Sequence, residues 1–215
     1  MRYCNRMNLK ITLFVLLKIS AFLFPIAIYA NTEKLKDPEI REFNLIWRNK
    51  VMGTAKATKT YTEKGYILNI TSRVKIKFIM EVDVTYFYES HFENDELTYS
   101  HVYNKINGKV YNNIWITKDG NDYRIDEEGQ KQRWIHGTSI RKTLAWAYFF
   151  EPKKVFSVFA EPLGKNGSIS EKEAGVYFFK SPEGNDNYFH YKNGTLKKVV
   201  IKYVLADFEM ILIEN

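Results

Sequence analysis

The central part of the chain alternates apolar and polar residues with a period of two. From Tyr66 to Tyr88 every even position except Ser72 is apolar or aromatic, whereas most odd positions are polar. This pattern is typical of β-strands that bury one face. Because a two-residue hairpin would reverse the parity, the pattern predicts one long bent strand over residues 66–88, or an odd-length loop or bulge near Thr71–Arg73.

Four turn signals follow this segment and predict an antiparallel meander. We take Asn94–Asp95, Asn107–Gly108, Asp119–Gly120 and Glu128–Gly129 as two-residue hairpin loops, because Asn, Asp and Gly favour the left-handed backbone of such loops. The four resulting registers agree on a single inward face. That face carries Val84, Tyr86, Tyr88, Tyr99, His101, Tyr103, Val110, Ile114, Ile116, Tyr123, Ile125 and Trp134.

One segment breaks the alternation and predicts a helix. The stretch GTSIRKTLAWAYFFEP has helical spacing of apolar residues, with Thr138 or Ser139 as the cap and Pro152 as the stop. Further along, the Asn-Gly hairpin in YFHYKNGTLKKVVIKYVL and the apolar FEMILI predict more strands. The expected fold is therefore mainly β, a strongly curved antiparallel meander forming a half-barrel or barrel, with one short capping helix near residues 139–149.

The first 30 residues have the composition of a secretory signal peptide. A basic start without acidic residues leads into a nearly continuous apolar run that ends at Ala30. An uncleaved anchor is the alternative because about 20 apolar residues can span a bilayer, but Lys18 and Pro25 disfavour it. We expect cleavage after Ala30, a flexible lead over residues 31–42, a single β-rich domain over residues 43–215, no membrane span after cleavage, and a periplasmic or secreted location.

Removing this leader changes the charge balance. The full chain has 32 basic and 25 acidic residues and a net charge of +7. Residues 1–30 hold four of the basic residues and no acid, so the rest has 28 against 25, a net charge of +3. This small excess disfavours nucleic acid as a partner, as do the acidic neighbours of the tyrosines in VDVTYFYES and the expected inward direction of those tyrosines.

The sequence contains no pattern that predicts a reaction or a cofactor. Ser139 and Lys142 match the Ser-x-x-Lys pattern of penicillin-binding acyl enzymes, but the partner motifs of those enzymes are missing, so Ser139 is interpreted as a helix cap. The single cysteine, Cys4, lies in the leader, and the four histidines form no local pair. We therefore expect neither a metal nor any other cofactor.

The inward aromatic face supplies the candidate site. In the expected registers Tyr88 lies opposite His101, and Trp134 lies opposite Tyr123. His101 is interpreted as a neutral histidine hydrogen-bonded to a tyrosine hydroxyl, with a ligand-contacting or acid–base role as the alternative. The candidate ligand contacts are Tyr86, Tyr88, Tyr99, His101, Tyr103, Tyr123 and Trp134.

Four features of the chain carry a family resemblance: the export signal, an early VMGT, the INGKVY hairpin and the late YFHYKNGTLKKVVIKY hairpin. Together they resemble an uncharacterised family of exported bacterial β-rich proteins, classed only as a domain of unknown function. The resemblance implies no catalytic residues. The expected architecture is also similar to the half-barrels of lipoprotein carriers and the barrels of lipocalins, a similarity of fold alone.

The leading functional hypothesis is an exported soluble protein that binds a hydrophobic or amphipathic small molecule, such as a lipid, in an aromatic-lined cavity without chemistry. The alternative is a structural or protein-interaction module of the periplasm or cell envelope with a fully packed core. A third hypothesis, an enzyme using His101 as acid or base, is disfavoured. The sequence predicts neither the identity of the ligand nor the oligomeric state.

Overall fold

The computed structural model describes residues 35–77, 81–184, 186–202 and 207–214. They belong to one compact unit, Leu35–Asn215. The expected signal peptide, residues 1–30, lies outside the described residues. The lead was expected to extend to residue 42, whereas the first strand already begins at Glu39.

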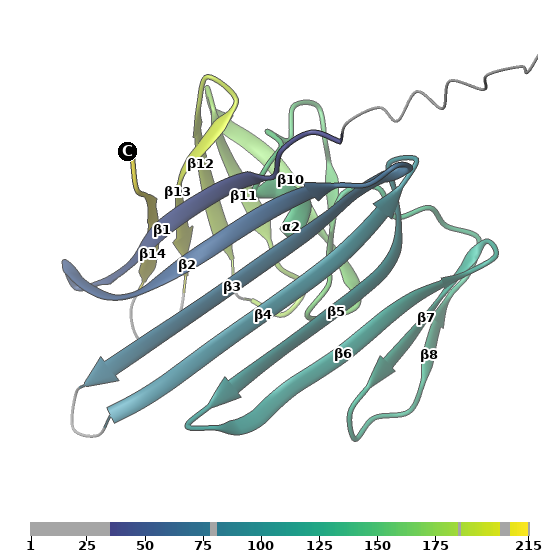
Figure 1. The fold of residues 1–215 in the computed structure, drawn as a ribbon, viewed down its shortest axis with the longest axis horizontal. Coiled ribbons are helices and arrows are strands. Elements are labelled where there is room, and N and C mark those ends of the chain that lie inside the picture. Colours follow the sequence, from purple (N-terminus) through teal and green to yellow (C-terminus); the bar gives the residue numbers. More distant parts are fainter. Residues whose placement is uncertain (1–34, 78–80, 185, 203–206, 215) are drawn as a thin grey trace, which may run out of the picture. The chain divides into compact units, whose positions relative to one another are not determined.

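The described residues form one antiparallel sheet of fourteen strands (Figure 1). The strands are β1 (Glu39–Trp47), β2 (Lys50–Tyr61), β3 (Gly65–Lys77), β4 (Glu81–Glu93), β5 (Glu96–Ile106), β6 (Lys109–Asp119), β7 (Asp122–Glu127), β8 (Arg133–Ile135), β9 (Ser157–Ala160), β10 (Lys165–Glu173), β11 (Val176–Lys180), β12 (Asn187–Lys192), β13 (Thr195–Ile201) and β14 (Phe208–Leu212). Their order is β8-β7-β6-β5-β4-β3-β2-β1-β14-β13-β12-β11-β10-β9.

The structure confirms the predicted fold class, a curved, mainly β antiparallel sheet with one short helix among the described residues. The sheet is open, since its order runs from β8 at one edge to β9 at the other. The last strand, β14, pairs with the first, β1, placing Phe43 opposite Leu212 and Leu45 opposite Met210. This pair joins the two halves of the sheet into one hydrogen-bonded surface.

The helix α2 (Leu144–Ala147) packs on the inner face of the sheet, by which we mean the face that carries the buried core. Its cap is Thr143, whose Oγ1 accepts a hydrogen bond from the Trp146 backbone N–H at 3.1 Å. The helix is therefore shorter than predicted and begins later than a Ser139 cap would allow. Arg41 of β1 donates to the Tyr148 carbonyl at 2.6 Å, and Tyr191 of β12 donates to the Ala147 carbonyl. Both halves of the sheet thus hold the helix.

The period-two segment folds as a hairpin of two long strands. β3 and β4 pair along their whole length, with Val74 opposite Val84. The prediction of one long bent strand is therefore wrong. The connection falls within residues 78–80, outside the described residues, and an odd number of connecting residues keeps the parity of both strands. The alternative prediction, an odd-length loop, is confirmed, but its predicted position near Thr71–Arg73 is wrong.

A β-bulge in the β4–β5 hairpin reverses the predicted face of β5. Next to the predicted Asn94–Asp95 turn the register is as expected, with Phe92 opposite Leu97, but Thr98 is an extra residue on the bulged strand. Beyond Thr98 the partner of Tyr88 is Val102 and not His101. A shift of one residue moves every following side chain to the other face.

A second bulge lies in the β5–β6 hairpin. The predicted Asn107–Gly108 turn is present, and both of its residues have positive φ, 50° and 77°. The register then shifts at Tyr111, so Asn104 pairs with Asn112 and Val102 pairs with Ile114. Ile114 therefore keeps its predicted inward direction, but opposite Val102 in place of His101.

The last two predicted turns fail in different ways. The β6–β7 loop is Gly120–Asn121, one residue later than predicted. The strand register therefore changes by two residues, which keeps each side chain on its predicted face, so Tyr123 and Ile125 still face inward. The β7–β8 connection is longer than a two-residue turn and pairs Arg124 with Trp134. Trp134 consequently faces outward and is 41% exposed.

Candidate ligand-binding site

The structure does not bring the seven predicted ligand contacts together. Tyr86 and Tyr88 lie on the inner face, and Tyr123 lies within the closed core. The outer face carries the remaining four, Tyr99, His101, Tyr103 and Trp134. Their predicted inward direction is wrong because the Thr98 bulge and the longer β7–β8 connection reverse the parity of β5 and β8.

The outward aromatic residues form cross-strand pairs. The His101 and Trp115 rings stack at 4.9 Å between centroids and 9° between planes, and the Phe87 and Tyr103 rings stack at 5.0 Å. In such pairs much of each ring face covers its neighbour, an arrangement that stabilises the sheet. His101 Nε2 hydrogen-bonds Asn113 Oδ1 at 2.8 Å, so the predicted tyrosine hydroxyl partner is wrong.

Tyr123 is a structural residue of the core. It is 0% exposed, and its hydroxyl donates to the Leu97 carbonyl at 2.8 Å and accepts from the Ile140 backbone N–H at 3.3 Å. Burial raises the pKa of this hydroxyl above its ordinary value, so it stays a neutral donor. Tyr123 thus connects β5 to the segment before α2 and leaves no polar group for a ligand.

A row of polar side chains crosses the inner face from β3 to β6. Ser72 pairs with Tyr86, Tyr86 with Asn104, and Asn104 with Asn112, so the four occupy neighbouring positions on one face. We call these four residues the inner polar row. The row on one side of it belongs to the core or packs on it and comprises Ile70, Tyr88, Val102 and Ile114. The row on the other side is only partly buried and comprises Val74, Val84 and Ile106.

Two oxygens of the inner polar row are buried acceptors without a donor. Asn112 Nδ2 donates to the Pro162 carbonyl at 3.0 Å, which fixes the orientation of this amide. The Oδ1 atoms of Asn112 and Asn104 are buried, and no residue in the described ranges donates to either of them. Leaving such an acceptor unsatisfied costs about 1–3 kcal/mol. These two oxygens have almost no accessible surface in the described structure, so a molecule on the inner face can donate hydrogen bonds to them only where it displaces the groups that cover them.

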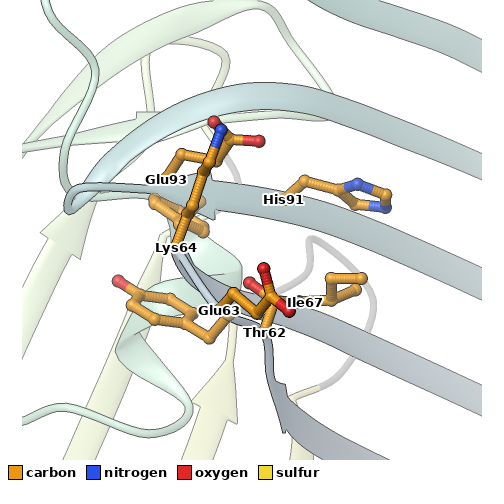
Figure 2. Close-up of a pocket in the computed structure, with 8 residues that line it drawn as sticks. Thr62, Glu63, Lys64, Ile67, His91 and Glu93 are labelled. Carbon is orange, nitrogen blue, oxygen red and sulfur yellow. The ribbon is translucent and has the colours of Figure 1, made fainter. Parts of the chain in front are cut away.

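A separate shallow pocket of ≈ 330 Å³ lies where the β2–β3 turn meets the end of β4. Its lining is formed by Thr62, Glu63, Lys64, Tyr66, Ile67, His91, Phe92 and Glu93. Figure 2 shows that the His91 ring points away from Lys64 and Glu93, so these polar groups do not converge on one point. No sequence pattern predicted this pocket. It is a groove at a turn, and its polar side chains are not aligned for a reaction.

Glu161 forms a buried polar cluster that the sequence reading missed. Its Oε2 accepts from the Leu144 N–H at 2.9 Å, and its Oε1 accepts from the Ala145 N–H at 3.2 Å and the Ser90 hydroxyl at 3.3 Å. Ser90 in turn contacts the Ser100 hydroxyl at 3.1 Å. Complete burial raises the pKa of Glu161 against these hydrogen bonds. All its partners belong to the core, so the cluster fastens α2 to the sheet.

The Ser-x-x-Lys pattern does not form a catalytic pair. Ser139 Oγ accepts from Arg141 Nε at 3.2 Å, whereas Lys142 Nζ lies 4.2 Å from the centroid of the Trp146 ring. Within the described ranges, no three histidine, cysteine or acidic side chains group closely enough to hold a metal ion. None of the helices in that part of the chain is long and apolar enough to cross a membrane.

The fold and the inner face define a curved, β-barrel-like antiparallel domain in which a polar row lies between two rows of mainly apolar side chains. The chain belongs to the family described as Domain of unknown function (DUF6134), whose model matches residues 43–213. A solved structure from Brucella abortus, a β-barrel-like protein of the domain of unknown function DUF1849, is similar with a TM-score of 0.54 and 10% identity. The match covers 84% of this chain and 98% of that one, and shows likeness of fold alone. No curated protein matches the chain.

Proposed function

We propose that the protein binds a hydrophobic or amphipathic small molecule on the inner face of its sheet, without catalysis. The observation that carries this proposal is the pair of donorless buried oxygens, on Asn104 and Asn112, beside the partly buried apolar side chains of Val74, Val84 and Ile106. Ligand sites combine such apolar walls with a few placed polar groups. The proposed contacts differ from the predicted set, because Tyr86 and Tyr88 are the members of that set that face inward outside the closed core.

The proposal is tested with the purified protein and the fluorescent probe N-phenyl-1-naphthylamine, which brightens in apolar surroundings. We expect saturable brightening that added amphiphiles reverse, together with co-purified amphiphiles in a solvent extract examined by mass spectrometry. If the probe does not brighten and the extract is empty, the proposal fails, and the structural or protein-interaction module becomes the better account.

A pair of variants locates the binding face. Val84→Trp places a large ring on the inner face, opposite Val74 and Ile106, and should weaken probe binding about tenfold or more by occupying the apolar wall. Thr85→Trp places the same ring at the next position of β4, on the outer face opposite Arg73 and Lys105, and should leave binding unchanged. Equal effects of the two variants would place the site elsewhere.

We also propose that the protein is exported. The support is the basic start, the apolar run and the small Ala30 of residues 1–30, which lie outside the described residues. Mass spectrometry of the protein from its native cells should then give Asn31 as the first residue. A protein that keeps residues 1–30 would contradict cleavage after Ala30.

A further inference from the structure

We infer that the inner polar row selects ligands whose polar end is an uncharged hydrogen-bond donor, such as the hydroxyls of a monoacylglycerol, over ligands that end in a carboxylate. This inference rests on the proposed function and adds the chemistry of the ligand's polar end. It comes from the geometry of the two amides, Asn104 and Asn112.

The orientation of the Asn112 amide is fixed from outside the row. Its nitrogen donates to the Pro162 carbonyl at 3.0 Å, and a carbonyl can only accept. Turning the amide over would place two oxygens against each other and lose this hydrogen bond. Asn112 therefore presents its oxygen as the free group, and that oxygen can only be satisfied by a donor.

The Asn104 oxygen adds a second acceptor at the neighbouring position. Asn104 and Asn112 are direct cross-strand partners, so both buried oxygens belong to one small area of the inner face. A polyol can donate to two acceptors at once through adjacent hydroxyls. A carboxylate, which only accepts when ionised, would meet both oxygens with unfavourable electrostatics and no hydrogen bond.

The other members of the row do not reverse this preference. The hydroxyls of Ser72 and Tyr86 can donate or accept, so they adapt to either kind of ligand. The four members of the row include no cationic side chain. Arg73 and Lys105, which flank the row in sequence, occupy the opposite parity and therefore the outer face. Arg73 is also paired there with Asp83 at 2.6 Å.

Three probes with the same decanoyl chain separate the donor requirement from simple hydrophobic binding. Monodecanoylglycerol donates hydrogen bonds, methyl decanoate is neutral but only accepts, and decanoate at neutral pH is an anion that only accepts. Each is titrated below its micelle concentration against the protein loaded with N-phenyl-1-naphthylamine. We expect monodecanoylglycerol to displace the fluorophore at concentrations about tenfold lower than either acceptor-only probe, as expected for two buried acceptors gaining donors.

Variants then assign the preference to the amides. Asn104→Leu removes one acceptor with little change of shape. It should weaken the binding of monodecanoylglycerol but not of methyl decanoate, so the difference between the two probes becomes smaller. Asn112→Leu should act in the same way, and it serves as the second variant if Asn104→Leu does not fold. Asn69→Leu makes the same change on the outer face of β3, opposite Glu89, and should keep the full preference.

The outcomes separate the two levels of the proposal. Equal displacement by all three probes, or a preference for decanoate, overturns the donor requirement while leaving small-molecule binding in place. A preference for monodecanoylglycerol that survives both Asn→Leu variants also overturns the assignment to the inner polar row. If none of the probes displaces the fluorophore, and it does not bind by itself, the proposed function and this inference fail together.

Discussion

Glu161 places an ionisable carboxyl where none of its surface reaches solvent. Its pKa is raised from 4.5 by burial, so the folded protein holds this proton at pH values where the unfolded chain has released it. The carboxyl therefore contributes stability that is full below pH 4.5 and is lost as pH rises through the folded pKa. Between the two pKa values the loss is about 1.4 kcal/mol per pH unit.

Glu161→Gln isolates this contribution, because glutamine keeps the shape of the side chain and does not titrate. We expect the difference in the free energy of unfolding, original protein minus variant, to be largest and constant below pH 4.5 and to fall toward neutral pH. Urea unfolding at a series of pH values measures both proteins. A difference that stays constant across the series would show that the folded and unfolded pKa values are alike.

Lys59 is the second residue whose surroundings allow a direct test. It is 7% exposed, its Nζ lies 2.8 Å from Glu39 Oε1, and the Phe150 ring centroid is 4.5 Å away. Lys59→Met should lower the free energy of unfolding by about 2 kcal/mol through the lost charged hydrogen bond. Lys56→Met is the control on the same strand, since its ion pair with Glu42 is 4.0 Å long and half-exposed, and it should cost under about 0.5 kcal/mol. Similar losses in urea unfolding would show that burial of the pair is unimportant.

At the scale of elements, turn chemistry was readable in the sequence and bulges were not. Asn107–Gly108 carries its own signal, because both residues accept positive φ. Thr98 carries no such signal, because a bulge residue can be recognised only by comparison with the neighbouring strand, on which it has no partner. Two sets of inward residues on β5 are both compatible with an amphipathic strand. One set is Leu97, Tyr99 and His101, and the other is Leu97, Ser100 and Val102. The first set led to the wrong prediction of an aromatic pocket. In the structure the second set faces the core.

Deletion of the bulge residue tests this account of β5. Removing Thr98 leaves His91 opposite Tyr99 and Phe92 opposite Leu97, so every other pair keeps its face, and we expect a folded protein with cooperative unfolding. Removing Thr71 from the regular β3 ladder should abolish folding, because it reverses the parity of Ile70 and Leu68 against both neighbouring strands. Circular dichroism during heating distinguishes the two; a loss of folding in both deletions would mean that the bulge itself is required.

The candidate site was only partly predictable for the same reason. Tyr86 and Tyr88 were placed correctly because β3 and β4 pair without a bulge over thirteen positions. Asn104 has the outward parity in the predicted register of β5, and its inward direction depends on the Thr98 bulge. Asn112 shares the inward parity of Ile114, but the predicted register places it opposite Tyr103 and not Asn104. A polar row on an inner face can therefore be recognised only after the register is known.

At the scale of the whole described domain, stability depends on the pairing of the last strand, β14, with the first strand, β1. β14 lies between β1 and β13, so it links the first eight strands to the last ones. Met210 of β14 is 4% exposed on the inner face, opposite both Leu45 and Val199. The two halves also share the core around α2, so we expect them to unfold together in one transition.

Met210→Asp tests the coupling of the two halves. The variant removes a buried side chain and places an unpaired charge in the core, which should lower the free energy of unfolding by about 3–5 kcal/mol. Ile211→Asp puts the same charge on the outer face, opposite Asn44 and Lys198, and should cost under about 1 kcal/mol. Urea unfolding followed by tryptophan fluorescence and by far-ultraviolet circular dichroism measures both. Because β14 joins the halves, Met210→Asp should shift both signals equally, and separate transitions would show that the halves fold independently.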